Sequence, residues 1–275
     1  MARSILITGC SSGIGLDAAR TLHRRGWRVF ATCRKPADCD RLRAEGLESF
    51  PLDHDDSRSI VAALDEAESR AGGGLDAVFV NGAYAIPGAV EDLPRDALRA
   101  IFETNLFGPV EIARRALPAM IARGAGRILF CSSVLGYVAA RHRGAYVGTK
   151  FALEGMADSL RMELRGTNVA VILIEPGPIA TPFRVNARPH FTRWIRWEEA
   201  RLAREYRERV IPRLFAENPP PDRFELPPAA VTAALIRALD APRPRARYRV
   251  TLPARLGRLV QILPSALRDR ILARA

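Results

Sequence analysis

The stretch SILITGCSSGIG, residues 4–15, decides the fold of this chain. Its first five residues form a short apolar run typical of a buried parallel strand. Three glycines follow in the spacing GxxxGxG and permit a tight turn, and a helical pattern begins at Ile14. Free backbone N–H groups and the helix dipole favour an anion at such a helix N-terminus. The stretch therefore predicts a strand, a phosphate-binding turn and a helix.

The same alternation of strand and helix continues through the chain. We expect strands at Ser4–Thr8, Arg28–Thr32, Ser49–Leu52, Ala77–Asn81, Arg127–Ser132, Val169–Glu175 and Arg247–Thr251. We expect helices at Ile14–Arg25, Asp38–Ala44, Ser57–Arg70, Pro94–Arg123, Tyr146–Arg165, Glu198–Val210 and Ala229–Leu239. This alternation predicts right-handed βαβ units and a doubly wound parallel sheet, an α/β Rossmann fold. A single domain, residues 1–275, with a C-terminal helical extension fits the length.

Composition narrows the class of protein. The four cysteines lie in the first half without a CxxC pair or a ligand-like histidine cluster, so we expect reduced thiols and no metal site. The N-terminus runs directly into a strand, and no apolar run approaches the roughly 20 residues of a membrane span. We therefore expect a cytoplasmic protein without a signal peptide.

The net charge of +12 is concentrated near the C-terminus, where residues 181–275 hold 20 arginines and 9 acidic residues. No nucleic-acid-binding motif accompanies this excess, so we expect no nucleic-acid partner. Residues 181–226, rich in Arg, Trp and Pro with a loop at Pro219–Pro221, are expected to form a substrate loop. The tail, residues 252–275, mixes Leu and Ile with Arg at helical spacing. It could pack on the domain, contact another subunit or lie peripherally on a membrane, and packing is the default.

Lys150 is one of only two lysines beside forty arginines, and it follows Tyr146 by four residues. Side chains at positions i and i+4 of a helix lie on the same face. A compact ammonium can sit beside a phenol where the wide guanidinium fork of arginine could not. The pattern therefore favours a functional pair, although an isolated YxxxK is more often ordinary surface and packing.

An ordered set of motifs accompanies this pair. It comprises TGCSSGIG at 8–15, Asp53 after the third strand, Asn105, Ser132-Ser133, YVGTK at 146–150, and PGPI at 176–179 with Thr181. Ser133 precedes Tyr146 by 13 residues. Over roughly residues 3–182 the chain resembles the single-domain short-chain dehydrogenases/reductases. It is similar within them to bacterial aldehyde reductases and to retinol and 17β-hydroxysteroid dehydrogenases.

The resemblance implies catalytic roles for four residues. Tyr146 would protonate the carbonyl oxygen in reduction, and Ser133 would hydrogen-bond that oxygen. Lys150 would bind the nicotinamide ribose and lower the phenol's pKa, which is otherwise about 10. Asn105 would hold a water in a proton relay, although an Asn that only distorts its helix explains the same feature.

The resemblance also implies a nicotinamide-nucleotide site. Its residues would be Gly9, Ser11, Ser12, Gly13, Ile14, Gly15, Asp53, Asn81, Gly82, Ala83, Tyr146, Lys150, Pro176, Gly177, Ile179 and Thr181. Asp55 and Asp56 blur the assignment of Asp53 to the adenine. Ala83 departs from the family pattern by placing a methyl where glycine is usual, and Gly82 before it could compensate.

The second strand decides between the two nicotinamide cofactors. NAD-selective members carry an acid at its end to bind the ribose 2′-hydroxyl. Here Arg34 and Lys35 occupy that place, and no acid occurs before Asp38. Arginine can hold a 2′-phosphate bidentately. We therefore expect NADP(H) rather than NAD(H), the alternative being two solvated charges in a loop.

The substrate pocket is expected from Tyr84–Val90, Leu135–Gly144 and the segment from Pro178 to about Leu226. Phe183, Phe191, Trp194 and Trp197 would suit a lipophilic carbonyl or alcohol substrate, but could equally be ordinary core. The leading function is NADPH-linked interconversion of an aldehyde or ketone with its alcohol. A retinoid or steroid alcohol dehydrogenase is the nearest alternative, and a non-catalytic NADPH-binding sensor is a different one. The resemblance implies a homodimer or homotetramer formed through the helices that carry Asn105 and Tyr146.

Overall fold

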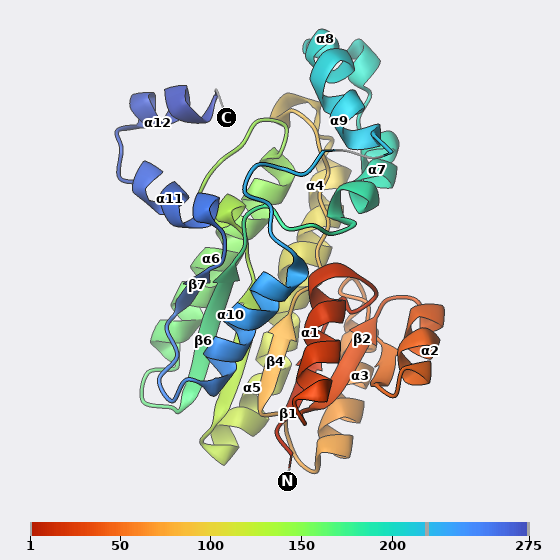
Figure 1. The fold of residues 1–275 in the computed structure, drawn as a ribbon, viewed down its shortest axis with the longest axis vertical. Coiled ribbons are helices and arrows are strands. Elements are labelled where there is room, and N and C mark those ends of the chain that lie inside the picture. Colours follow the sequence, from red (N-terminus) through yellow and green to blue (C-terminus); the bar gives the residue numbers. More distant parts are fainter. Residues whose placement is uncertain (1, 218–219, 274–275) are drawn as a thin grey trace.

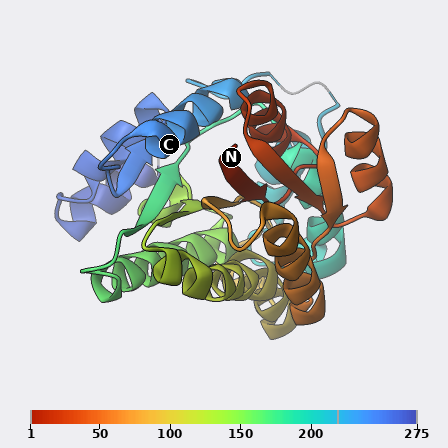
Figure 2. The same cartoon turned by 90° about the horizontal axis from the view of Figure 1, so that it is seen from below.

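The computed structural model describes residues 2–217 and 220–273, so Pro219 of the expected proline loop and the last two tail residues lie outside it. Seven parallel strands form one sheet in the order β3-β2-β1-β4-β5-β6-β7. Helices cover both faces of the sheet, as Figures 1 and 2 show. The predicted single-domain, doubly wound α/β fold is confirmed.

Strand bounds follow the buried apolar runs. They are β1 Ser4–Ile7, β2 Arg28–Cys33, β3 Glu48–Pro51, β4 Ala77–Val80, β5 Gly126–Cys131, β6 Val169–Glu175 and β7 Arg247–Arg249. The order reverses between β1 and β4, whose pairing Ile5↔Ala77 begins a parallel register. In open α/β sheets ligands bind at such a switch point, beyond the carboxyl ends of the strands.

The helices that pack on the sheet are α1 Gly13–Arg24, α2 Pro36–Ala44, α3 Ser57–Ala71, α5 Gly108–Arg123, α6 Gly144–Glu163 and α10 Pro228–Asp240. Helix α4 Arg95–Phe102 packs on α6, and its buried residues Ala97 and Ile101 lie above the sheet. The remaining ones lie at the carboxyl end of the sheet: α7 Phe183–Trp194, α8 Ala203–Glu205, α9 Ile211–Phe215, α11 Leu252–Val260 and α12 Ser265–Leu272.

Alternate residues of each strand enter opposite cores, as the period of two requires. Ile5 and Ile7 of β1 belong to the core under α1, α2 and α10, whereas Leu6 faces α3, α5 and α6. A third apolar cluster, centred on Tyr206 and Phe191, lies above the sheet around Tyr146. The end of the molecule beyond the carboxyl ends of the strands therefore has a hydrophobic core separate from the two cores that cover the sheet.

Most predicted elements match the structure within two residues at each end, but two predictions were wrong. The helix expected over Pro94–Arg123 is interrupted by a π-helical segment, η2, at Glu103–Phe107. The helix expected at Glu198–Val210 is instead a succession of short pieces, 3₁₀ at Trp197–Glu199, α8, π at Tyr206–Val210 and α9. Helix α7, which contains Pro189, was not expected.

Candidate functional site

The glycine-rich turn has the backbone that an anion site needs. Gly9 and Gly13 have φ of 70° and 58°, in the left-handed region that glycine adopts without penalty. A Cβ on Gly15 would collide with the carbonyl oxygen of Gly9 and lie 2.8 Å from Nδ2 of Asn81. In the described chain the Ser12 side chain caps none of the free N–H groups of α1. The turn is therefore a close-fitting cradle of backbone donors.

Asn81 fixes this cradle from the neighbouring strand. Its backbone N–H donates to Oγ1 of Thr8 over 2.9 Å, and its Nδ2 donates to the carbonyl oxygens of Thr8 (3.1 Å) and Gly9 (3.4 Å). The side chain predicted to meet the cofactor thus also holds the turn that would receive it.

Gly82, which precedes the departure from the family pattern at Ala83, leaves space for the buried side chain of His54. A Cβ on Gly82 would lie 3.0 Å from Cε1 of His54, and the neighbouring Ala83 packs at the margin of the third cluster. His54 Nδ1 lies 2.9 Å from the carbonyl oxygen of Thr104, so Nδ1–H donates this bond. Burial lowers the pKa of His54, which favours the neutral imidazole. Sequence reasoning missed His54, although the change to glycine at position 82 was a signal for it.

Tyr146 and Lys150 lie together at the start of α6, as the spacing predicts. Lys150 is 2% exposed, and its Nζ donates to the carbonyl oxygen of Cys131 over 2.8 Å. Nζ lies 5.6 Å from the centroid of the Tyr146 ring. The ring of Phe183 packs edge-on against Tyr146, with centroids 5.3 Å apart. The pair is therefore buried, and β5 fixes the position of the cation.

Ser133 lies directly after β5 and belongs to the same site. It is 8% exposed, and its Oγ accepts a hydrogen bond from the backbone N–H of Leu135 over 3.1 Å. A hydrogen bond between the Ser133 and Tyr146 side chains lowers the pKa of the phenol. Serine hydroxyl and phenol therefore face the same space.

The chain by itself raises the pKa of Tyr146, so the expected lowering stays a prediction for the complex with the positively charged nicotinamide. Burial raises the pKa of Tyr146 well above its ordinary value, and Cys131 adds to the rise. The Ser133 hydrogen bond and the charge of Arg143 lower it by less. Burial also lowers the pKa of Lys150. Removal of the phenol and the ammonium from water is thus the largest cause of both pKa shifts.

Asn105 occupies the middle of the π-helical segment η2 and is fully buried. Its Oδ1 accepts from the backbone N–H of Tyr84 (3.0 Å), and its Nδ2 donates to the Tyr84 carbonyl oxygen (2.8 Å) and to Oγ1 of Thr149 (3.2 Å). Single π turns are frequent at functional sites. The helix distortion considered for Asn105 is present, and it turns the amide toward α6.

The Pro-Gly turn closes the site from the other side. The carbonyl oxygen of Pro176 accepts from the N–H of Val134 over 2.8 Å, and Ile179 pairs with Leu226 in an isolated parallel bridge. A Cβ on Gly13 would lie 3.0 Å from Cγ2 of Thr181. The phosphate turn and the Pro-Gly turn are therefore in contact distance of each other.

Basic residues border the glycine-rich turn. Arg34 and Lys35 follow β2 and are exposed, and Lys35 is the N-cap of α2. Arg41 of the same helix donates from Nη2 to the carbonyl oxygen of Ser11 over 2.7 Å, and Nη2 lies 3.5 Å from the carboxylate of Asp38. Sequence reasoning missed Arg41, since only the folding of α2 against the turn brings it there.

Asp53 lies two residues beyond β3 and is half-buried. Its backbone N–H donates to Oγ of Ser59 over 3.0 Å, and its Oδ1 accepts from the N–H of Asp55 over 3.2 Å. Asp56 instead caps α3 by accepting from the N–H of Arg58. The three neighbouring carboxylates therefore have different tasks: Asp53 holds the turn at Asp55, and Asp56 caps α3.

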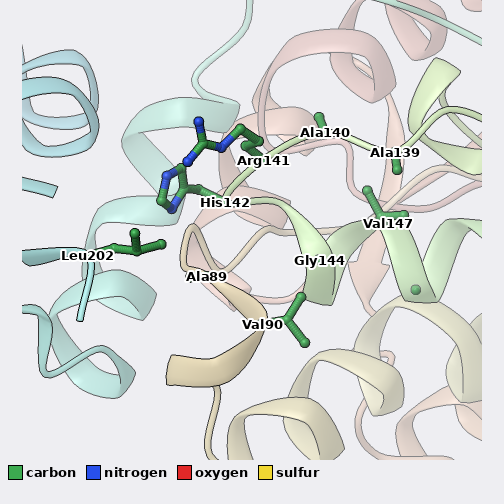
Figure 3. Close-up of a pocket in the computed structure, with 10 residues that line it drawn as sticks. Ala89, Val90, Ala139, Ala140, Arg141, His142, Gly144, Val147 and Leu202 are labelled. Carbon is green, nitrogen blue, oxygen red and sulfur yellow. The ribbon is translucent and has the colours of Figure 1, made fainter. Parts of the chain in front are cut away.

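A cavity of about 470 Å³ opens next to the start of α6 (Figure 3). Its lining is mostly apolar and comprises Ala89, Val90, Ala139, Ala140, Arg141, His142, Gly144, Val147, Gly148 and Leu202. Two of the segments expected around the substrate contribute to it, and Leu202 represents the third. His142 is held by Glu205, whose Oε1 lies 3.0 Å from its Nε2.

The four aromatic residues considered for the pocket do not line this cavity in the described structure. Phe191 is 3% exposed and belongs to the third core cluster, while Trp194 and Trp197 pack at its margin. Phe183 covers the ring of Tyr146. Most of this aromatic surface is therefore core that supports the site.

These groups fit a nicotinamide nucleotide. The glycines of the Gly9–Gly15 turn let it pack closely on Asn81 and Thr181, and the free N–H groups at the start of α1 are donors for a pyrophosphate. The fixed ammonium of Lys150 provides donors for ribose hydroxyls beside the phenol. In the described part of the chain, no helix is both long enough and apolar enough to cross a membrane.

Known proteins with similar sequences agree with this arrangement. The family model described as "short chain dehydrogenase" matches residues 3–191. The uncharacterized oxidoreductase YbbO of Escherichia coli is 37% identical over 99% of this chain and 94% of its own length. Mouse retinol dehydrogenase 16 is 32% identical over 98% and 87%. Human 17-beta-hydroxysteroid dehydrogenase type 1 is 34% identical over 91% and 78%.

A solved short-chain dehydrogenase from Streptomyces avermitilis superposes with a TM-score of 0.76 at 25% identity, covering 100% of this chain and 98% of its own. The match over residues 3–191, the full-length relatives and the cradle with its Tyr-Lys pair lead to one conclusion. The chain belongs to the short-chain dehydrogenase family and is an oxidoreductase that acts on alcohol or carbonyl groups with a nicotinamide cofactor.

Proposed function

We propose that this enzyme interconverts a lipophilic aldehyde or ketone and its alcohol with NADP(H). The observation that carries the proposal is the position of the buried Tyr146 phenol, whose ring centroid lies 5.6 Å from Nζ of the buried Lys150. A phenol held in its protonated form suits a general acid that donates to a carbonyl oxygen.

The reaction assigns one task to each side chain. When bound, the nicotinamide supplies or accepts the hydride at the substrate carbon. In reduction, Tyr146 Oη gives its proton to the carbonyl oxygen while the Ser133 hydroxyl hydrogen-bonds the same atom and supports its developing charge. Lys150 Nζ would hold the cofactor ribose, and its positive charge would stabilise the tyrosinate that is left after proton transfer, until a proton from solvent restores the phenol. Asn105 fixes the loop at Tyr84 and orients the approach of a water to Lys150.

The proposed preference for NADP(H) over NAD(H) is based on the basic residues beside the glycine-rich turn. Arg34 and Lys35 stand where an acid would repel a 2′-phosphate, and Arg41 holds the adjacent Ser11 carbonyl. Exposed guanidinium and ammonium groups there give charge-assisted hydrogen bonds to phosphate. The double variant Arg34→Ala/Lys35→Ala should raise the Kd for NADPH about 10- to 100-fold. The Kd for NADH in the same fluorescence titration should barely change, and an equal loss for both would contradict the selectivity.

The apolar ring of Phe183, packed edge-on against Tyr146, supports a lipophilic substrate. The deciding experiment measures NADPH oxidation with aliphatic aldehydes of increasing chain length, retinal and ketosteroids, beside Tyr146→Phe. We expect turnover of the apolar carbonyls and a loss of at least about 100-fold in kcat in the variant. Preference for retinal or a ketosteroid would favour the alternative dehydrogenase function. NADPH binding without turnover of any carbonyl would favour the non-catalytic sensor.

We further infer self-association through α5 and α6. Phe107, Phe151 and Met156 lie at or on these helices with exposed fractions of 53%, 42% and 47%. Large exposed apolar side chains on adjacent elements indicate a protein contact. Light scattering should give a dimer or tetramer, and Phe107→Ser/Phe151→Ser should shift it toward the monomer. A monomeric wild type would contradict this inference.

A further inference from the structure

The C-terminal helix α11 packs on the domain through its small residues. Ala254 and Gly257 are buried, and a Cβ on Gly257 would lie 2.9 Å from Cγ2 of Val138. Tyr137 donates its hydroxyl to the carbonyl oxygen of Ala254, and Gln261 donates to the carbonyl oxygen of Tyr137. The side of α11 that faces the domain is therefore packed and hydrogen-bonded.

The large apolar side chains of α11 and α12 face away from the domain. Ile262 between the helices is 78% exposed and Leu259 is 61% exposed. The other members of this apolar face are 41–49% exposed: Leu252, Leu256, Leu267 and Ile271. An ordinary amphipathic helix buries such residues and exposes small or polar ones. Here the large apolar side chains are exposed and the small residues are buried, which indicates that another molecule covers the exposed surface.

The charges around this apolar face are mostly positive. Arg255 and Arg270 are exposed on the same two helices, Arg258 lies beside Glu154 and Glu175 of the domain, and Asp269 is the only acidic residue after position 251. A second copy placed symmetrically on the face would bring these arginines together. A surface of phosphates would instead neutralise them, while the leucine and isoleucine side chains enter the acyl region.

We propose that α11 and α12 bind the surface of an anionic phospholipid bilayer. Figure 1 shows these helices at the same end of the molecule as α7–α9, beyond the carboxyl ends of the strands. The cavity lining from Ala139 to Gly144 follows the residues on which α11 packs. Docking would therefore hold the active end near the membrane. The proposal does not depend on which carbonyl compound the enzyme reduces.

The test is co-sedimentation of the full-length protein with vesicles of phosphatidylcholine alone or mixed with phosphatidylglycerol. We expect binding to the mixed vesicles at least tenfold tighter. Leu256→Ser/Leu259→Ser/Ile262→Ser should lose at least tenfold of it. Arg255→Gln/Arg270→Gln should weaken it about fivefold per arginine removed. The matched controls Met162→Ser and Arg204→Gln change equally exposed residues elsewhere and should bind as the wild type does.

Circular dichroism and NADPH binding verify that each variant is folded, so that a loss of vesicle binding can be attributed to the substituted surface residues. Equal binding to both kinds of vesicle, absence of binding by the wild type, or unchanged binding by the triple serine variant would overturn the proposal. A triple variant that alters only the oligomeric state would overturn it too and would assign the face to a second copy.

Discussion

At the scale of one residue, the burial of Tyr146 determines whether its side chain is present as the phenol or as the tyrosinate. Because its pKa is raised, the phenol form persists further into the alkaline range than that of a free tyrosine, and this form is the proton donor that reduction requires. Oxidation requires the tyrosinate, which becomes more populated only as pH rises.

We therefore predict opposite pH dependences for the two directions. Rates of carbonyl reduction should be constant near neutral pH and fall at alkaline pH, whereas rates of alcohol oxidation should rise with alkalinity. Initial rates of both reactions, measured across neutral and alkaline buffers at saturating cofactor, test this. An oxidation rate that falls as pH rises would mean that another group is the base.

Gly15 and Gly155 form a matched pair for a second residue-scale prediction. Gly15→Ala places a Cβ against the Gly9 carbonyl, so it should cost about 1–3 kcal/mol of unfolding free energy and weaken nucleotide binding. Gly155 lies in α6 with open space around it, so Gly155→Ala should stabilise by up to about 1 kcal/mol. Urea unfolding and NADPH titration measure both, and a harmless Gly15→Ala would contradict the close-fitting cradle.

At the scale of elements, the π-helical segment between α4 and α5 decides where Asn105 points. A π turn displaces the regular hydrogen-bond pattern. His54 donates to the carbonyl oxygen of Thr104 within this segment, and Gly108 leaves room for it, because a Cβ there would lie 2.8 Å from that of His54. The histidine therefore supports Asn105 without touching the reacting atoms.

We predict that His54→Leu leaves the Thr104 carbonyl without its donor and costs about 1–3 kcal/mol. Because Asn105 then loses its fixed orientation, kcat should fall several-fold while KM changes less. His54→Asn, which retains a donor, should recover part of kcat. Urea unfolding and steady-state kinetics measure these effects. Equal kcat in all three proteins would show that His54 only fills space.

The sequence allowed most of the sheet and the catalytic spacing to be predicted, because buried strands and the YVGTK helix carry strong local patterns. Local patterns could not show that Lys150 would bond the Cys131 carbonyl, since β5 and α6 meet only in the fold. Helix α7 was missed because Pro189 and the aromatic residues obscure its periodicity. Its aromatic side chains find their partners in Tyr206 and Phe215, which are distant in sequence.

At the scale of the whole molecule, Arg247 joins the last strand to the rest. Its guanidinium lies 3.0 Å from Glu154 and 2.8 Å from Asp158, both on α6, and 3.0 Å from the fully buried Glu175 of β6. One side chain thus neutralises carboxylates of two elements. The edge strand β7 is attached through this charge as well as through its backbone.

We predict that Arg247→Gln destabilises the fold by about 1–3 kcal/mol, because it removes the ion partner of the buried Glu154, whereas Glu175 keeps Arg249 and Asp158 keeps Arg161. Arg204→Gln is the control, since its pair with Glu208 is exposed and should contribute less than about 1 kcal/mol. Urea unfolding of both variants measures the difference. Similar midpoints for the two would indicate that water enters and solvates the network.

Gly177 lies against Thr251, the residue that caps α11, so closely that a Cβ would overlap the threonine hydroxyl. The segment that begins α11 therefore packs directly against the turn at Pro176–Pro178. An engineer who shortens this chain to residues 3–191, the range that the family model matches, would remove that contact. The smallest working version of the enzyme must therefore extend beyond Thr251, and a tag is safer at the N-terminus.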